Sequence, residues 1–302
     1  MTASMSTMTM KTDSTTMKTD STTALTDSTT MKTDSTMTTA GIQADSIHGQ
    51  LKETCLFLAQ YAASLLGSGC TSSRIEKNVA RIAAGCGVLA EMIILPRTVM
   101  LTVWDRDRNH SYTTSARQSG DGIDFRLITL LSRLSWDVRD GNVTFADAVS
   151  RFGELRVGQR LSPWLVTLLV GLANASFCRL FSGDAVSMLI VFVATVEGLL
   201  VKNKLHKDWK WDLRIAILTA ACLSAVIASS GYVFHLGSTP DVALATSVLY
   251  LIPGVVYINS VSDLIHCHLL CGFSRFMNAA LITLCIGIGL SSGILLMNIH
   301  FF

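Results

Sequence analysis

Charged residues are scarce in this chain of 302 residues. They make up 15% of it, whereas hydrophobic residues make up 50%. A soluble globular protein usually carries about 25% charged residues, so the composition favours a membrane protein. The net charge of +2 is small, and the sequence has no basic stripe with interleaved aromatic residues. These absences argue against nucleic-acid binding.

Familiar catalytic and nucleotide-binding motifs are absent as well. The sequence contains no G-x-x-x-x-G-K-[ST], no H-E-x-x-H and no paired C-x-x-C, which excludes a P-loop ATPase. The eight cysteines are spread along the chain, unlike those of a small disulfide-bonded domain. No cleavable signal peptide is recognisable at the N-terminus. We therefore predict that the chain is not an enzyme, needs no cofactor and inserts into the membrane through internal helices.

The best candidate for a metal site is the segment from His266 to Cys271. It contains His266, Cys267, His268 and Cys271. On a helix, His268 and Cys271 share one face while His266 points elsewhere, so four ligands would not converge on one ion. We predict no metal site.

The first 44 residues form a low-complexity tail. The unit M-K-T-D-S-T-T begins at Met10, recurs at Met17, returns in degenerate form at Ala24 and recurs at Met31. Its seven-residue period gives no coiled-coil seam, because Thr, Ser and Asp fill the positions that would have to be apolar. Such a composition does not bury enough apolar surface to offset its ordering entropy, so we predict disorder. This composition is compatible with a repeat tract expanded in the gene that has no function of its own. It is also compatible with a tail that is phosphorylated or that tethers the protein to a surface.

Residues 45–160 are predicted to form a small α+β domain. Apolar residues at spacings of three and four predict an amphipathic helix from Ile47 to Leu65, and a second helix runs from Ile75 to Cys86. Residues 88–95, 98–104 and 110–116 favour three β-strands. Two further helices precede residue 160.

Residues 161–302 are predicted to form a transmembrane domain of five helices. A span needs about 20 apolar residues, and the segments that satisfy this are 161–181, 185–201, 213–234, 242–261 and 276–300. Small residues four apart in the third span and Gly289-x-x-x-Gly293 in the fifth indicate close packing against partner helices. Basic residues in the loops predict a cytoplasmic N-terminal domain and a periplasmic C-terminus; they are Arg151, Arg156, Arg160, Lys202, Lys204, Lys207, Lys210, Arg214 and Arg275.

Three ionisable residues in or beside the first two spans stand out. An ionisable group inside a span costs at least about 2.5 kcal/mol to insert, so it usually lines a pathway or has a partner. Glu197 is the clearest example, with pairing to Lys202 or Lys204 at the interface as the alternative. Arg179 and Asp184 flank the turn between these spans, where a mutual salt bridge is the simpler interpretation.

A helix break is predicted in the fourth span. Pro253 and Gly254 interrupt the backbone hydrogen bonds, as often happens where the backbone lines a substrate cavity; a plain proline kink is the alternative. Asn259 and Asp263 follow this break. We predict that both line the substrate or proton path, and that Arg275 and Arg179 supply positive charge for a carboxylate.

Three stretches of the sequence resemble the threonine/serine exporter family. They run from Leu65 to Ala83, from Pro163 to Asp184, and from Val248 to Arg275, and the resemblance covers roughly residues 47–299. All three resemble the family's two-component form, and the second and third are most similar to the large subunit of a bacterial succinate exporter. The repeat tail departs from the family, and Glu197 is not one of its signatures.

The resemblance implies a subunit of a secondary exporter in the bacterial inner membrane. Its substrate would be a succinate-like dicarboxylate or threonine and serine. Its partner would be a small all-membrane subunit of the same family, and a homo-oligomer is also compatible with the sequence. The alternative function is a membrane-anchored sensor or scaffold whose cytoplasmic domain binds a ligand or protein, although anchoring needs only one span.

Overall fold

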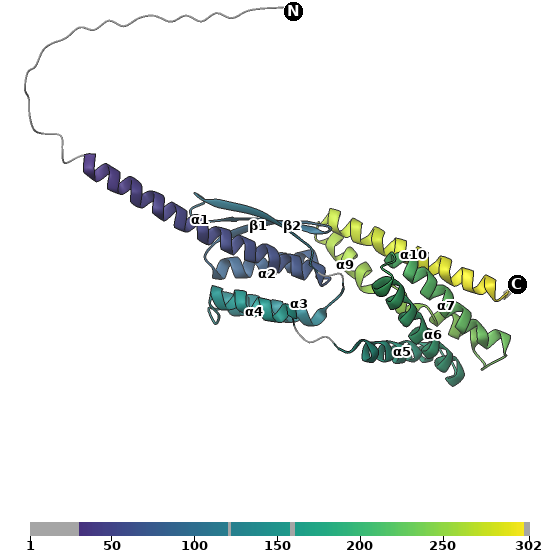
Figure 1. Ribbon diagram of the computed structural model, residues 1–302. Helices are drawn as coiled ribbons and strands as arrows, with labels where there is room; N and C mark the ends of the chain where they lie inside the picture. Colours follow the sequence, from purple (N-terminus) through teal and green to yellow (C-terminus); the bar gives the residue numbers. More distant parts are fainter. Residues whose placement is uncertain (1–29, 120–121, 158–160, 299–302) are drawn as a thin grey trace, which may run out of the picture. The chain divides into compact units, whose positions relative to one another are not determined.

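The computed structural model describes residues 30–119, 122–157 and 161–298 of the chain (Figure 1). It is mostly helical, with one small sheet between its second and third helices. The helices before the predicted spans are α1 (Thr30–Gly67), α2 (Ser72–Gly85), α3 (Phe125–Arg139) and α4 (Phe145–Val157).

Helix α1 corrects part of the prediction for the N-terminal tail. It begins at Thr30, so residues 30–44 are helical rather than disordered. No proline or glycine occurs between Thr30 and Ala40, and extending an existing helix is far easier than nucleating a new one. The rest of the predicted tail, residues 1–29, lies outside the described residues.

The sheet has three antiparallel strands in the order β1-β2-β3. These are β1 (Leu89–Leu95), β2 (Thr98–Trp104) and β3 (Ser111–Arg117). Alternate residues of the central strand, Val99, Leu101 and Val103, are fully buried. Cys55 of α1 points its thiol at the carbonyl oxygen of Leu101, 3.5 Å away, so this face of the sheet packs on α1. The three strands agree with the sequence prediction.

Tyr61 joins the helices of this part of the chain. It is fully buried, and its hydroxyl donates a hydrogen bond of 2.8 Å to the carbonyl oxygen of Leu131 on α3. Burial raises the pKa of this phenol above its ordinary value, so it stays protonated as a donor. Phe57, one turn earlier, packs edge-on against Phe145 and Phe152 at centroid distances of 5.5 and 5.6 Å.

Four helices of the second half are long and apolar enough to cross a membrane. They are α5 (Pro163–Leu180), α6 (Ala185–Asn203, continued by a π-helical turn to Asp208), α7 (Leu213–Val233) and α10 (Leu269–Leu296). A fifth crossing results if α8 (Pro240–Thr246), the 3-10 turn Leu249–Leu251 and α9 (Gly254–Ile265) form one broken span, bent by 59°. The chain is therefore a helical membrane protein with four or five spans.

The last span starts earlier than predicted. Helix α10 begins at Leu269 rather than Phe276, and therefore includes Arg275. A charge at this position predicts a span boundary, whereas Arg275 pairs with buried Asp263 at the end of the helical bundle. A paired charge does not have to leave the helix to reach water. The predicted end of this span at His300 lies outside the described part of the chain.

Small residues hold α7 and α10 together, and Figure 1 shows the two helices side by side. The predicted stripe on α7 is fully buried; it comprises Ala216, Ala220, Ser224 and Ala228. On α10, a Cβ atom at Gly293 would lie 2.7 Å from the carbonyl oxygen of Cys222, and one at Gly289 would collide with the carbonyl oxygen of Leu218. The two glycines of α10 thus pack on Leu218, Ala221, Cys222 and Ala225 of α7. Ser224 of the predicted stripe instead donates a hydrogen bond of 3.0 Å to the carbonyl oxygen of Ala194 on α6. Both small-residue faces are therefore covered within one chain, and they are no evidence for a further subunit.

Candidate functional site

The broken span brings polar residues to one end of the helical bundle. The chain leaves helical geometry at Ile252 and Pro253, and α9 begins at Gly254 without a side-chain cap on its first N–H groups. Asn259 and Asp263 lie four residues apart on α9, so they share a face of the helix. That face points toward the loop between α1 and α2.

Asp263 is the centre of a buried polar cluster. Its carboxylate is fully buried. Oδ1 accepts a hydrogen bond of 2.8 Å from the backbone N–H of Ser72, and Oδ2 lies 3.0 Å from Nη1 of Arg275 on α10. A buried carboxylate is tolerated only when it is paired and hydrogen-bonded, and both conditions are met here.

Asn259 and Arg275 bind the same loop. Nδ2 of Asn259 donates a hydrogen bond of 2.7 Å to the carbonyl oxygen of Gly69, and Nη2 of Arg275 donates one of 2.9 Å to that of Cys70. His268, in the turn between α9 and α10, adds a contact of 3.4 Å to Glu76 of α2. The cluster therefore attaches the α1–α2 loop to the broken span and to α10.

The loop can be bound in this way because of Gly69. This residue has a φ of +79°, a left-handed conformation that glycine adopts at little cost and that commonly ends a helix. The thiol of the next residue, Cys70, is buried, and burial raises its pKa to about 11. The thiol is thus neutral at physiological pH. The backbone carbonyl oxygen of Cys70 accepts the hydrogen bond from Arg275.

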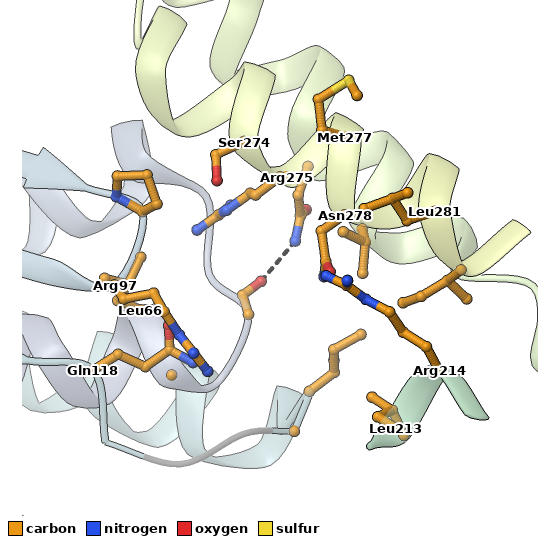
Figure 2. Close-up of a pocket in the computed structure, with 18 of the residues that line it drawn as sticks. Leu66, Arg97, Gln118, Leu213, Arg214, Ser274, Arg275, Met277, Asn278 and Leu281 are labelled. Carbon is orange, nitrogen blue, oxygen red and sulfur yellow. Dashed lines mark hydrogen bonds between the residues drawn. The ribbon is translucent and has the colours of Figure 1, made fainter. Parts of the chain in front are cut away.

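A cavity of about 760 Å³ adjoins the cluster (Figure 2). It lies between the α1–α2 loop, the sheet, the start of α7, and helices α9 and α10. Arg97 and Gln118 extend into it from the sheet, while Arg214 and Asn278 approach from the helical bundle (Figure 2). Its volume falls within the usual range of about 300–1,000 Å³ for small-molecule sites.

The cavity is predominantly positive. Arg97, Arg214 and Arg275 line it, and Asp212 is the sole acidic residue among its described lining residues. Oδ1 of Asp212 accepts a hydrogen bond of 2.8 Å from the backbone N–H of Arg214, because Asp212 caps the start of α7. Arg275 faces Asp263, and Arg97 and Arg214 add two further guanidinium groups to the lining.

The residues singled out from the sequence divide into two groups. Asn259, Asp263 and Arg275 come together, and two of them, Asn259 and Arg275, line the cavity. Arg179, Asp184 and Glu197 are not among its lining residues. The break at Pro253 and Gly254 precedes the first group along α9.

Arg179 and Asp184 have separate structural roles. Nη1 of Arg179 donates to the carbonyl oxygen of Gly183 at 3.2 Å, and no ion pair with Asp184 occurs among the described residues. Asp184 caps α6 through the N–H of Ser187 and also accepts hydrogen bonds from Ser238 and Thr239. These donors, led by Ser187, hold its pKa below the ordinary carboxyl value. The simple salt bridge expected from the sequence is therefore wrong.

Glu197 is exposed on α6. In the part of the chain that the structure covers, it forms no ion pair with Lys202 or Lys204. The pairing considered in the sequence analysis is thus not formed.

Sequence reasoning missed Arg97, Gln118, Arg214 and Asn278 as cavity residues. In the sequence, Arg214 served only as one of the basic loop residues that predict the orientation of the spans. Arg97 lies in the tight turn after Pro96. No local motif links these positions, because they meet only through the packing of the sheet on the helical bundle.

The histidines and cysteines near residue 268 do not gather around one point. His266 ends α9, Cys267 has a φ of +64° in the turn, and His268 begins α10 facing Glu76. Within residues 30–119, 122–157 and 161–298, no group of three or more ligating side chains could hold a metal ion.

The chain combines a bundle of apolar helices, one broken span and a polar cavity at the end of the bundle. These features are typical of the helical membrane proteins to which secondary transporters belong. The chain belongs to the threonine/serine exporter family. Residues 56–297 match the family model described as "Putative threonine/serine exporter". The family resemblance found in the sequence is thereby confirmed, and it identifies the chain as a membrane transport protein.

Curated relatives point in the same direction. A Klebsiella aerogenes protein named "Probable succinate transporter subunit YjjP" is 29% identical over 239 residues, which cover 76% of this chain and 89% of the relative. The protein of the same name in Escherichia coli K12 is 29% identical over 238 residues, covering 74% and 88%. An uncharacterised protein of Haemophilus influenzae is 28% identical over 126 residues, or 41% of each chain. No solved structure matches this chain.

Proposed function

We propose that this chain is the large subunit of a secondary exporter for small dicarboxylates in the bacterial inner membrane, driven by the proton gradient. Residues 45–160 form its cytoplasmic domain, and residues 161–302 cross the membrane five times, ending in the periplasm. A small all-membrane subunit of the same family completes the exporter. Family membership supports transport, and the word "subunit" in the names of two relatives supports the partner.

The arginine-lined cavity is the observation that carries the substrate assignment. Arg97 and Arg214 approach it from opposite sides (Figure 2), which suits an anion with a carboxylate at each end. Arginine binds carboxylates through two parallel hydrogen bonds. Threonine and serine also carry an ammonium group, and the only described acid in the lining, Asp212, is occupied at the start of α7. The charges therefore favour a succinate-like dicarboxylate over an amino acid.

The residues predicted for the transport path take different parts in this proposal. Asn259 and Arg275 border the cavity, whereas buried Asp263 keeps Arg275 in place and fixes the α1–α2 loop. The break at Pro253 and Gly254 opens the route toward the far side of the membrane, where free N–H groups at the start of α9 can meet an anion. Arg179 and Asp184 lie at the opposite end of α6 from the basic loop, on the periplasmic side.

Binding of radiolabelled succinate to the purified protein in detergent tests the cavity. Arg97→Gln and Arg214→Gln each remove a charged hydrogen-bond partner worth about 1.5–3 kcal/mol, so we expect each to weaken binding by roughly 10- to 100-fold. Arg133→Gln, an exposed arginine on α3 outside the cavity, is the matched control and should bind as the wild type does.

Competition separates the two substrate classes. Unlabelled malonate or glutarate should displace succinate, and threonine should not. Wild-type affinity in both cavity variants would overturn the site, and stronger displacement by threonine would overturn the dicarboxylate assignment.

A further inference from the structure

A second polar cluster lies at the end of the helical bundle opposite the cavity. His206, just after α6, and Leu213, at the start of α7, line the cavity. Helices of 19 and 21 residues are roughly 28–32 Å long at about 1.5 Å per residue. The turn before α6 and the loop after α7 therefore lie at the far end of the bundle.

The carboxylate of Asp184 joins this turn to this loop. Oδ1 accepts hydrogen bonds of 2.9 Å from the backbone N–H of Ser187 and of 3.0 Å from the hydroxyl of Thr239. Oδ2 accepts one of 3.0 Å from the backbone N–H of Ser238. The backbone N–H of Asp184 donates to Oγ1 of Thr239 at 2.9 Å, and the Ser187 hydroxyl donates to the Thr239 carbonyl oxygen at 2.9 Å. The start of α6 and the start of α8 are thus bound to each other directly.

The far end of the bundle is closed around this cluster. Gly237 has a φ of +78°, and a Cβ atom there would lie 2.6 Å from Oδ2 of Asp184, so the loop approaches the carboxylate as closely as its backbone allows. Deeper in the bundle, Cys178 of α5, Val191 of α6 and Ala243 of α8 pack together and are fully buried. The contacts of Asp184 therefore cover an apolar core that separates the cavity from this end.

The broken span connects the cluster to the cavity. Thr239 immediately precedes α8, the first half of the span, and Asn259 on α9, the second half, lines the cavity. A secondary transporter opens its substrate site to one side of the membrane at a time. A substrate that enters the cavity must then leave at the far end, where the broken span is bound to the turn before α6.

We infer that Asp184 and Thr239 form the outer gate of the transport path. The hydrogen bonds between them hold the gate closed, and they break when α8 moves away from the start of α6 to release the substrate. The inference rests on the proposed exporter, and it adds the point at which the path opens on the side opposite the cavity.

A disulfide bond across the gate tests this role. Oγ of Ser187 and Oγ1 of Thr239 lie 3.1 Å apart, so Ser187→Cys/Thr239→Cys brings two thiols together. In proteoliposomes that also contain the small subunit, oxidation should stop succinate efflux and dithiothreitol should restore it. The oxidised, purified variant should still bind labelled succinate with wild-type affinity, because the cavity lies at the other end of the bundle.

A disulfide in the sheet is the matched control. The hydroxyls of Thr102 and Thr113 face each other at 2.9 Å on β2 and β3, so Thr102→Cys/Thr113→Cys joins two elements that the gate does not involve. Its oxidation should leave succinate efflux unchanged.

The reactivity of Cys178 reports on the gate without any transport. Thr239→Val removes the hydroxyl that both donates to and accepts from Asp184, so opening should become roughly tenfold more frequent. A maleimide should then label the buried Cys178 faster by the same factor in the full chain purified in detergent, as measured by mass spectrometry. Thr219→Val should keep the wild-type rate, because the Thr219 hydroxyl bonds carbonyl oxygens of its own helix.

Two results would overturn the gate: efflux that continues after the disulfide between residues 187 and 239 has formed, or a wild-type rate of Cys178 labelling in Thr239→Val. The two readouts also keep the gate and the exporter apart. Efflux that survives the disulfide would reject the gate and keep the exporter. Faster Cys178 labelling without succinate efflux from the wild-type protein would reject the exporter and keep an opening at this end.

Discussion

Breaking the ion pair between Asp263 and Arg275 should destabilise the protein strongly. Asp263 is fully buried, and the side chain of Arg275 is 14% exposed. Removing one partner of a buried pair leaves an uncompensated charge and costs about 3–5 kcal/mol. We expect about 3 kcal/mol for Asp263→Asn, because Arg275 keeps its hydrogen bond to Cys70 and some exposure to water. Arg275→Gln should cost more, since it leaves the carboxylate with the Ser72 N–H alone.

A double-mutant cycle isolates the pair from these secondary effects. The free energies of unfolding of both single variants and of Asp263→Asn/Arg275→Gln are measured by chemical denaturation in detergent, followed by tryptophan fluorescence. The double variant should be more stable than the sum of the single losses predicts, with an interaction energy of about 2 kcal/mol. Asp107→Asn with Arg106→Gln, both exposed in the β2–β3 turn, should give almost no interaction energy. Additive losses at Asp263 and Arg275 would refute the reasoning.

Two further predictions concern movement and packing. The Ser72 hydroxyl is adjacent to the thiol of Cys271, so Ser72→Cys places two thiols side by side. Oxidation should then join the α1–α2 loop to α10 through a disulfide bond. If this loop must leave α10 during transport, the disulfide should stop succinate efflux, and dithiothreitol should restore it. Ser72→Cys/Cys271→Ser is the control, and efflux that continues after disulfide formation would show that this contact stays closed. Gly293→Leu should separate α7 from α10 and lower Tm, because a Cβ there already lies 2.7 Å from the Cys222 oxygen. Gly287→Leu, with nothing within 4 Å, should leave Tm unchanged, and equal losses in both variants would contradict the packing.

The apolar spans and the three strands could be predicted because their signals are local. Long hydrocarbon runs after residue 160 and alternating residues around Val99 and Leu101 depend on neighbours within one element. The start of α10 could not be predicted in this way, since it depends on whether Arg275 has a partner. That partner, Asp263, also binds Ser72, which is 191 residues away in the sequence.

The residues of the candidate site also divide into those that the sequence predicts and those that only the folded structure brings together. Asn259, Asp263 and Arg275 were found because polar residues near a membrane helix are rare, but their contacts with a backbone loop had no sequence signal. Arg97 and Arg214 carry the charge of the cavity, yet each looks like an ordinary loop arginine in the sequence. Only the packing of the sheet against the helical bundle brings them to one cavity.

Efflux of labelled succinate from proteoliposomes is the most direct test of the proposed exporter. The vesicles contain this chain with the small subunit, this chain alone, or neither, and a proton gradient is imposed across their membrane. The proposal predicts rapid efflux only when both chains are present, its loss in Arg214→Gln and normal efflux in Arg133→Gln. Succinate that binds the purified chain but is not moved under any of these conditions would contradict the exporter and favour a membrane-anchored sensor.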